Sequence, residues 1–227
     1  MTLAENFGRT LVIAPHPDDE ILGCGGLIAR LADEGGEVHV AVVTKGQEPA
    51  FTATMTATVR AEAAAAHRHL GVFKTHWLDQ PAAMLAETPH ADLNAALRAI
   101  VQDVLPQTLL VPFVGDIHLD HQLIFLSALV AARPHQPDFP TTILAYETVS
   151  ETNWNAPYVT PGFRPQVFVD IGSQLQRKLE AMAMFRSQLR DFPHERSLET
   201  LKALAVIRGT SMHRSAAEAF VSIRQIL

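Results

Sequence analysis

The amino-acid sequence predicts a single-domain, Rossmann-like α/β fold, with a mostly parallel sheet and helices on both of its faces. Short apolar runs alternate along the chain with longer amphipathic stretches, a pattern typical of strands joined by crossover helices. Residues 10–14 and 38–43 are apolar at almost every position, as expected of parallel strands covered on both faces. The 227 residues, 48% of them hydrophobic and 19% charged, are enough for one domain over residues 1–227.

The hydrophobic period places the strands and the helices between them in order. Strands are expected near residues 10–14, 37–43, 73–78, 108–112, 141–146 and 166–170. Three helix faces are marked by Leu93, Leu97, Ile100 and Val104, by Leu175, Leu179, Met182 and Phe185, and by Leu198, Leu201 and Leu204. The Pro-rich run 134–140 and residues 147–165 break the alternation, and the second is long enough to be a binding loop or lid.

Charge and cysteine content limit the partners of the protein. The formal net charge is -6 and no stripe of Lys and Arg is present, which argues against nucleic acid or an anionic membrane as the main partner and favours a small polar substrate. The single cysteine, Cys24, excludes an internal disulfide, and residues 1–9 lack the layout of a secretory signal. No apolar run approaches the roughly 18 residues that span a bilayer. We therefore expect a cytoplasmic protein. The sequence leaves its oligomeric state open and is compatible with a homo-oligomer.

Two polar motifs follow apolar runs of the predicted sheet. The first, Pro15-His16-Pro17-Asp18-Asp19-Glu20, comes directly after the strand at 10–14. The second, Asp116-Ile117-His118-Leu119-Asp120-His121, follows the strand at 108–112. Open α/β sheets place their chemistry in the crevice beyond the carboxyl ends of the strands. The two turns are therefore expected to meet over one metal ion.

The two motifs together contain the ligands of a hydrolytic zinc site. Such a site takes three protein ligands from His, Asp and Glu and leaves one position for water, whose pKa falls towards about 7. We expect His16, Asp19 and His121 to be the ligands, and iron is compatible with the same set. Asp18, next to a ligand but pointing elsewhere, is expected to be the general base.

His118 is expected to act beside the metal. It lies three positions before His121, so on the first turn of a helix the two imidazoles face the same cavity. One binds the metal, and the other is free to donate a hydrogen bond to an oxyanion. Asp120 or Asp116 is expected to fix the tautomer of His118 or to keep its ring protonated. An imidazolium next to a basic carboxylate is a workable acid/base pair.

Each of these residues also has an ordinary structural interpretation. Asp18 or Asp19 alone is most simply a helix N-cap. A single histidine at position 118 or 121 is more often a surface or helix-terminal residue than a ligand. Two His/Asp motifs, each on a strand-to-helix turn, are difficult to explain as a coincidence, and we therefore prefer the metal site.

The two motifs resemble those of the PIG-L/LmbE-like family of zinc-dependent N-acetylglucosaminyl deacetylases. In that family the first motif reads His-Pro-Asp-Asp-Glu after the first strand, and the second ends in His-x-Asp-His. The resemblance covers most of the chain. Further groups are similar to the bacterial branch in order and spacing: Arg60 and Glu62, Leu70-Gly71, Tyr146-Glu147-Thr148, Asn153-Trp154, Phe168-Val169-Asp170-Ile171, His194 and Arg196-Ser197.

This resemblance implies a metal-dependent hydrolase that removes the acetyl group from an N-acetylated amino sugar and releases acetate and a free amine. The implied roles are zinc ligands for His16, Asp19 and His121, general base for Asp18, oxyanion stabilisation for His118 with Asp120 tuning it, and substrate contact for Arg60. The implied partner is a small N-acetylated sugar.

The chain departs from the family pattern after its second strand. Many members have Thr-Asp-Gly or Thr-Asn-Gly there, whereas this chain reads Thr44-Lys45-Gly46. The change places a cation near the expected sugar site, where it favours a phosphate or carboxylate on the substrate. Leu119 stands where many members have proline, at a position that is not a ligand.

Three other functions fit parts of the pattern. A metallo-β-lactamase-type hydrolase has a similar His-x-His-x-Asp-His motif, but that group carries it early in a β-rich chain. A binding or scaffold protein that keeps the metal without catalysis is disfavoured by the intact Asp18 and intact ligands. A zinc amidase acting on a non-sugar N-acyl substrate differs from a sugar deacetylase only in its substrate pocket.

Overall fold

All six predicted strands are present in the computed structural model, which describes residues 2–135 and 137–226. Within these residues the sheet has seven strands: β1 (Thr10–Ala14), β2 (Val38–Lys45), β3 (Lys74–Pro81), β4 (Thr108–Pro112), β5 (Thr142–Tyr146), β6 (Val167–Asp170) and β7 (Ala217–Gln225). The helices are α1 (Leu3–Phe7), α2 (Asp19–Asp33), α3 (Ala53–Leu70), α4 (His90–Val104), α5 (Leu119–Ala131), α6 (Leu175–Ala183) and α7 (Leu198–Thr210). Short 3₁₀ turns lie at Leu85–Glu87 (η1) and Thr152–Trp154 (η2).

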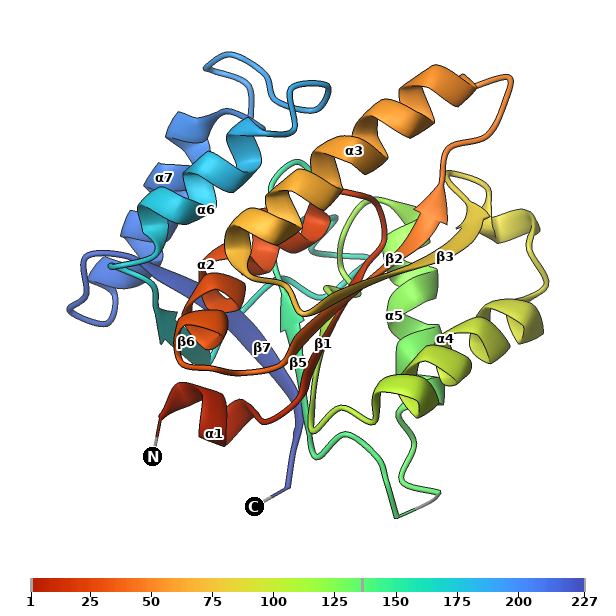
Figure 1. Ribbon diagram of the computed structural model, residues 1–227, viewed down its shortest axis with the longest axis horizontal. Helices are drawn as coiled ribbons and strands as arrows, with labels where there is room; N and C mark the ends of the chain where they lie inside the picture. Colours follow the sequence, from red (N-terminus) through yellow and green to blue (C-terminus); the bar gives the residue numbers. More distant parts are fainter. Residues whose placement is uncertain (1, 136, 227) are drawn as a thin grey trace.

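The sheet has the order β3-β2-β1-β4-β5-β7-β6. Its first five strands are parallel, whereas β7 is antiparallel to both β5 and β6. Figure 1 shows helices on both faces of the sheet. The predicted fold class, a mostly parallel α/β sheet covered on both sides, is confirmed.

The sequence analysis missed strand β7. Its first four residues, 217–220, are all buried, so no alternation of apolar and polar positions marks them as a strand. Ala217, Glu218 and Ala219 also have weak β propensity. The position between β5 and β6 overrides that preference, because the ladder to β5 pairs Val221 with Ala145 and Phe220 with Tyr146.

Each face of the sheet has its own apolar core. Helices α2, α3, α6 and α7 cover one face, where Leu27, Met182 and Phe185 are buried. Helices α4 and α5 cover the other, where Leu97 and Ile124 are buried. The three predicted helical faces all lie in these cores, either buried or packed against them.

The topology places a crevice at the ends of two adjacent strands. Strands β1 and β4 are neighbours in the sheet, but α2 after β1 packs on one face and α5 after β4 packs on the other. A crevice opens at such a switch point, beyond the carboxyl ends of the strands, and ligands bind there in open α/β folds. Both polar motifs lie at this point.

The two irregular segments occur as predicted. Residues 147–165 contain no α-helix or strand, and η2 is their one 3₁₀ turn. The described positions of 134–140 form neither helix nor strand; residue 136 lies outside the described part. Among the described residues, no helix combines the length and apolar character needed to cross a membrane. The cytoplasmic location stays a prediction.

Candidate metal centre

The turn after β1 is fixed by its neighbour β2. Thr44 donates to the carbonyl of Pro15 through its backbone N–H, at 3.1 Å, and through its hydroxyl, at 2.8 Å. The backbone N–H of His16 donates to Oδ2 of Asp19 at 2.8 Å. Asp18 has a φ of 123°, which is unfavourable for a residue with a side chain. These constraints hold the three predicted site residues of this turn in the crevice.

His121 enters the crevice from the first turn of α5, and its ring is held from behind. Its Nδ1 lies 2.8 Å from Oδ2 of Asp116, whose Oδ1 accepts a hydrogen bond from the Thr152 hydroxyl at 2.6 Å. The opposite ring atom, Nε2, lies 3.2 Å from Oδ2 of Asp19. A carboxylate on the far nitrogen is the usual support of a metal-binding histidine.

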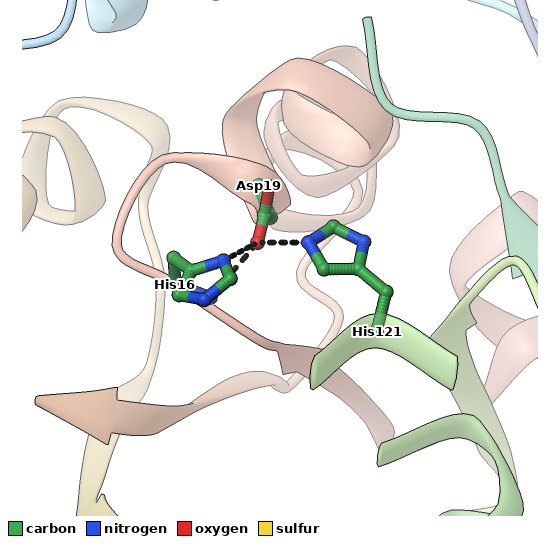
Figure 2. A group of neighbouring side chains, drawn as sticks. All are labelled: His16, Asp19 and His121. Carbon is green, nitrogen blue, oxygen red and sulfur yellow. Dashed lines mark hydrogen bonds and ion pairs between the residues drawn. The ribbon is translucent and has the colours of Figure 1, made fainter. Parts of the chain in front are cut away.

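His16, Asp19 and His121 converge on one point (Figure 2). Oδ2 of Asp19 lies 3.3 Å from Nδ1 of His16, and one ligand atom from each residue lies within 4.8 Å of the others. Within the described part of the chain, Oδ1 of Asp19 is buried without a hydrogen-bond partner, which is rare for polar atoms in a folded protein. The buried Nε2 of His121 has the 3.2 Å ion-pair contact with Oδ2 of Asp19 but no hydrogen bond of good geometry. Two imidazole nitrogens and one carboxylate form the ligand set of catalytic zinc sites. The residues therefore fit a divalent metal ion.

The charges around the site also favour a cation. Burial acts to lower the pKa of His121, but the carboxylates of Asp19 and Asp116 have the larger combined effect and raise the pKa to about 10. Burial likewise lowers the pKa of His16, and hydrogen bonds to Asp120 and Asp19 raise it to about 9. The carboxylates thus favour positive charge on both imidazoles, and a divalent ion provides positive charge at the same place.

His118 is the N-cap of α5 rather than a residue of its first turn. Its Nδ1 accepts the backbone N–H of Asp120 at 3.1 Å, and its ring centroid lies 4.6 Å from that of His16. Because Nδ1 is an acceptor, the neutral ring carries its proton on Nε2 and can donate from there. Burial and the nearby His16 lower the pKa of His118 to about 4. The lowered pKa therefore favours the neutral ring over the imidazolium alternative.

Asp120 and Asp116 do not support His118 in the expected way. Oδ2 of Asp120 lies 3.1 Å from Nε2 of His16 and also accepts the backbone N–H of Ala83 at 2.7 Å, while Asp116 holds His121. The physical reason is that the first amides of a helix need an acceptor, and the His118 ring provides one. The tautomer of His118 is thus fixed by the backbone of α5, and the carboxylate of Asp120 orients His16.

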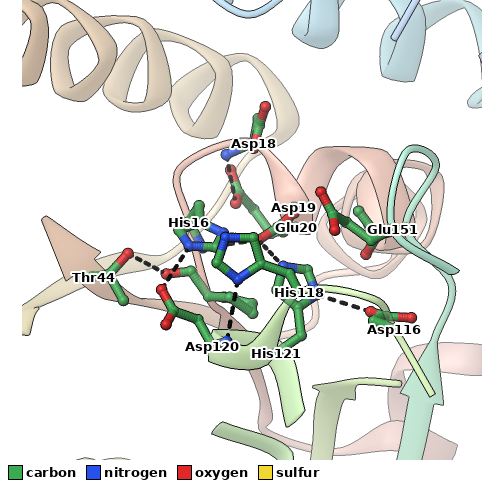
Figure 3. A network of polar contacts seen from close by, with 12 residues as sticks. His16, Asp18, Asp19, Glu20, Thr44, Asp116, His118, Asp120, His121 and Glu151 are labelled. Carbon is green, nitrogen blue, oxygen red and sulfur yellow. Dashed lines mark hydrogen bonds and ion pairs between the residues drawn. The ribbon is translucent and has the colours of Figure 1, made fainter. Parts of the chain in front are cut away.

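Asp18 lies next to the predicted ligands, within the same network of polar side chains (Figure 3). Asp18 is the N-cap residue of α2, as its ordinary structural interpretation predicts, but its side chain makes no capping hydrogen bond and is therefore available to the site. Burial raises its pKa to about 8, against the opposing effect of Arg196. Nη1 of Arg196 lies 3.3 Å from Oδ2 of Asp18, and Nη2 lies 3.5 Å from Oε1 of Glu151. Arg196 therefore joins two carboxylates of the site.

The sequence analysis assigned no role to Glu151 or Arg196. Glu151 follows β5, the next parallel strand beyond β4, and its place after a strand end was a usable signal. Arg196 comes from a loop 178 residues away from Asp18, and no local pattern indicates its contact.

A buried chain of hydrogen bonds supports the turn from behind. Glu20 accepts the backbone N–H of Asp18 at 3.2 Å and lies 2.9 Å from Nε2 of His67. Nδ1 of His67 lies 2.7 Å from the hydroxyl of Thr75. His67 has a structural role, because it ties the turn to α3 and β3.

Arg60 lies on α3 at the wall of a pocket beside these residues. The pocket has a volume of about 500 Å³, and His16, Asp18 and His118 also line it. The Arg60 guanidinium lies 4.7 Å from the ring centroid of Trp77 and pairs with Asp79. The structure thus places Arg60 next to the predicted ligands, and its contact with substrate stays a prediction.

Comparison with protein families identifies one match. The family described as PIG-L, GlcNAc-PI de-N-acetylase, matches residues 11–132. The uncharacterized deacetylase YaiS of Escherichia coli (strain K12) is 32% identical over 188 residues, which cover 78% of this chain and 90% of that protein. A 1D-myo-inositol 2-acetamido-2-deoxy-alpha-D-glucopyranoside deacetylase of Mycobacterium sp. (strain JLS) is 26% identical over 242 residues, covering 86% of this chain and 79% of that protein.

Solved structures share the fold over nearly the whole chain. The conserved protein TT1542 from Thermus thermophilus has a TM-score of 0.78 and 26% identity and covers 96% of both chains. The N,N'-diacetylchitobiose deacetylase of Pyrococcus horikoshii has a TM-score of 0.77 and 24% identity, covering 96% of this chain and 85% of that one. GalB, a 4-carboxy-2-hydroxymuconate hydratase from Pseudomonas putida KT2440, has a TM-score of 0.75 and 22% identity, covering 96% and 98%. Because a hydratase shares the fold, the function must be argued from the site.

Proposed function

This chain belongs to the GlcNAc-PI de-N-acetylase (PIG-L) family and is a deacetylase of the N-acetylglucosaminyl type, and we propose that it uses zinc to hydrolyse the acetamido group of a small N-acetylated amino sugar. The observation that carries the proposal is the convergence of His16 and Asp19 from the β1 turn with His121 from α5, next to Asp18. The products are acetate and the free amine.

The three converging residues are the proposed zinc ligands. Asp116 and Asp120 orient the rings of His121 and His16 by contacts of 2.8 and 3.1 Å, so the other nitrogen of each imidazole is directed at Oδ2 of Asp19. A bound zinc ion provides Lewis acidity, which lowers the pKa of water and polarises a carbonyl group. Ferrous iron is compatible with the same ligands, and metal analysis distinguishes the two.

Asp18 is the proposed general base. Burial raises its pKa to about 8, close to neutral pH, as suits a general base. Its ionised form at the pocket wall takes a proton from the attacking water and then returns it to the leaving amine. Arg196 restricts the orientation of this carboxylate through the 3.3 Å contact. His118 lines the same pocket and donates from Nε2 to the oxyanion that develops on the acetyl carbonyl oxygen when water attacks the carbonyl carbon.

Arg60 is the proposed contact to the sugar. It lies on the pocket wall, and its stacking on Trp77 and pairing with Asp79 hold the guanidinium in place. A fixed guanidinium can donate to sugar hydroxyls without losing much side-chain entropy when substrate binds.

The first experiment measures acetate release from a panel of N-acetylglucosamine conjugates by the purified protein, with a chelated sample and a zinc-reconstituted sample beside it. We expect release that the chelator abolishes and zinc restores. The metal content of His121→Ala, measured by mass spectrometry, is expected to fall well below that of the wild type. Zinc-loaded protein that releases acetate only from non-sugar N-acyl compounds would support the amidase alternative. Bound zinc without any hydrolysis would support the binding-protein alternative.

A further inference from the structure

The pocket beside the metal centre is larger than an acetamido group requires. Its volume is about 500 Å³, within the usual range for small-ligand sites. A second hollow of about 530 Å³ adjoins it, and Lys45, Phe51 and Arg60 line both. The remainder of the substrate, beyond the reacting group, must therefore lie among the side chains that line the pocket.

Four basic side chains line the pocket: Lys45, Arg60, Arg190 and Arg196. Two of them are neutralised, because Arg196 pairs with Asp18 and Glu151 and Arg60 pairs with Asp79. Lys45 and Arg190 differ from these two. Across residues 2–135 and 137–226, neither has a carboxylate within ion-pair distance. Arg190 uses only Nη1, on the backbone carbonyls of Ser187 and Leu189.

These two unpaired cations belong to chain segments that are distant in sequence. Lys45 ends β2 and is partly buried, whereas Arg190 lies in the loop between α6 and α7. The pocket therefore has unneutralised positive charge on two of its walls, in a chain whose formal net charge is -6. The sequence drew attention to Lys45 alone, and only the fold adds Arg190.

We propose that Lys45 and Arg190 form a subsite for an oxyanion, a phosphate or a carboxylate, carried by the N-acetylated sugar substrate. The proposal rests on the proposed deacetylase function. When a substrate fills the pocket it displaces water from these cations, and a neutral substrate leaves that loss of solvation uncompensated. An oxyanion compensates it with charge-assisted hydrogen bonds, and a guanidinium can bind two of its oxygens at once.

Apolar side chains of the same pocket accommodate the uncharged part of the substrate. Phe51, Met55 and Val59 present apolar side chains to the pocket from the start of α3 and the loop before it. Sugar rings have apolar faces, and a pocket lined by both apolar and charged side chains orients a molecule that carries both kinds of surface. Substrates of this class are therefore anionic N-acetylhexosamine conjugates rather than neutral glycosides.

The test compares kcat/KM for matched neutral and anionic substrates. Methyl N-acetylglucosaminide is the neutral probe, N-acetylglucosamine 1-phosphate is the phosphate probe, and the carboxymethyl glycoside of N-acetylglucosamine is the carboxylate probe. We expect the ratio of anionic to neutral kcat/KM to exceed about tenfold for at least one anion, as one charge-assisted hydrogen bond implies. The two anionic probes separate a phosphate from a carboxylate substrate. The ratio is expected to fall as salt is added, because salt screens exposed charges.

Two variants test the named residues. Lys45→Met and Arg190→Met are each expected to reduce the anionic-to-neutral ratio by about tenfold. Lys202→Met is the matched control, because Lys202 is exposed on α7 and does not line the pocket; the ratio is expected to stay at the wild-type value there. Binding of N-acetylglucosamine 1-phosphate to Asp18→Asn protein, measured by calorimetry with and without Lys45→Met, gives a readout that needs no turnover.

The outcomes separate the two proposals. Equal kcat/KM for neutral and anionic probes, unchanged in Lys45→Met and Arg190→Met, would overturn the anion subsite and leave the deacetylase function intact. Absence of acetate release from every probe by zinc-loaded protein would instead overturn the proposed sugar substrate.

Discussion

Helix α2 carries buried charge at two places, and the two are built differently. In its middle, Glu218 of β7 accepts hydrogen bonds from the backbone N–H groups of Gly26 and Leu27 at 2.8 and 2.7 Å. Lys178 of α6 donates to Glu218 at 2.6 Å and to the carbonyl of Leu22 at 2.9 Å. Every charged atom of this pair has a partner, which is the condition for burying charge in a stable core.

At the start of α2 the charges are not satisfied in this way. Asp19 and His121 each keep one buried polar atom without a hydrogen bond among the described residues. Asp18 has an unfavourable φ of 123°. Both features cost stability, and they persist where the surrounding structure holds a site for a ligand. In this helix the fully hydrogen-bonded charge pair joins elements of the fold, whereas the incompletely hydrogen-bonded pair of Asp19 and His121 lies at the proposed site of chemistry.

Asp18→Asn tests the functional half of this comparison and is expected to have the largest effect. Asparagine tolerates the backbone conformation but cannot take a proton, so kcat should fall by about 10²- to 10⁴-fold. Metal content is expected to match the wild type. Turnover would be followed by acetate release, and metal content by mass spectrometry. Wild-type turnover in this variant would remove Asp18 from the mechanism.

Lys178→Met tests the structural half. Removal of one partner leaves the buried Glu218 carboxylate without its cation, and the free energy of unfolding should fall by about 3–5 kcal/mol. Denaturant unfolding measures this loss. The same change at the exposed Lys202 is expected to stay within about 0.5 kcal/mol of the wild type. The kcat of folded Lys178→Met protein should be close to that of the wild type, and a selective loss of kcat would contradict the division between the two places.

Arg196→Lys sharpens the comparison, because Arg196 contacts the unsatisfied site without touching the proposed ligands. Lysine keeps the charge but cannot reach Asp18, Glu151 and Ser150 together as the guanidinium does. We expect kcat to fall by about tenfold with a smaller change in KM, because the base loses its orientation.

The control for Arg196→Lys is Arg208→Lys. Arg208 pairs with Glu147 through two contacts of 2.8 and 2.6 Å, and neither residue lines the pocket. This control is expected to reduce stability but not kcat. Equal kinetic effects of the two substitutions would show that Arg196 has only a structural role.

A largely buried imidazole pair between β2 and the edge strand β3 provides the smallest test. Nδ1 of His39 and Nε2 of His76 lie 3.0 Å apart, and two charged rings cannot share that contact. Burial, with Lys74 and His39, lowers the pKa of His76 below its ordinary value of 6.5. Below pH 6.5 the folded state therefore binds fewer protons than the unfolded chain. The free energy of unfolding consequently decreases as the pH falls below 6.5. In His76→Gln the melting temperature should decline less between pH 7 and pH 5 than in the wild type; an equal decline would show that the pair does not titrate.

Much of the fold was predictable because parallel strands buried on both faces leave a continuous apolar run, as in residues 10–14 and 108–112. β7 was not, because its buried residues include Ala217, Glu218 and Ala219, whose place in the sheet depends on β5 and β6. The site was predictable in its ligand types and in its place after β1 and β4. The hydrogen bonds that orient those ligands were not predictable, because the orientation of a carboxylate such as Asp116 or Asp120 depends on the packing of α5.

The sequence by itself determined which residues meet: two motifs after neighbouring strands of a parallel sheet come together at its carboxyl edge, whatever the details of packing. The tertiary structure alone decided how they meet. It brought three pairs of side chains within hydrogen-bond distance: Asp116 and His121, Asp120 and His16, and Arg196 and Asp18. It also brought Arg190 to the pocket that Lys45 lines. The physical reason is that hydrophobic periodicity encodes which face of an element is buried, whereas a hydrogen bond depends on the position of two side chains to within a fraction of an ångström, which only the packed chain defines.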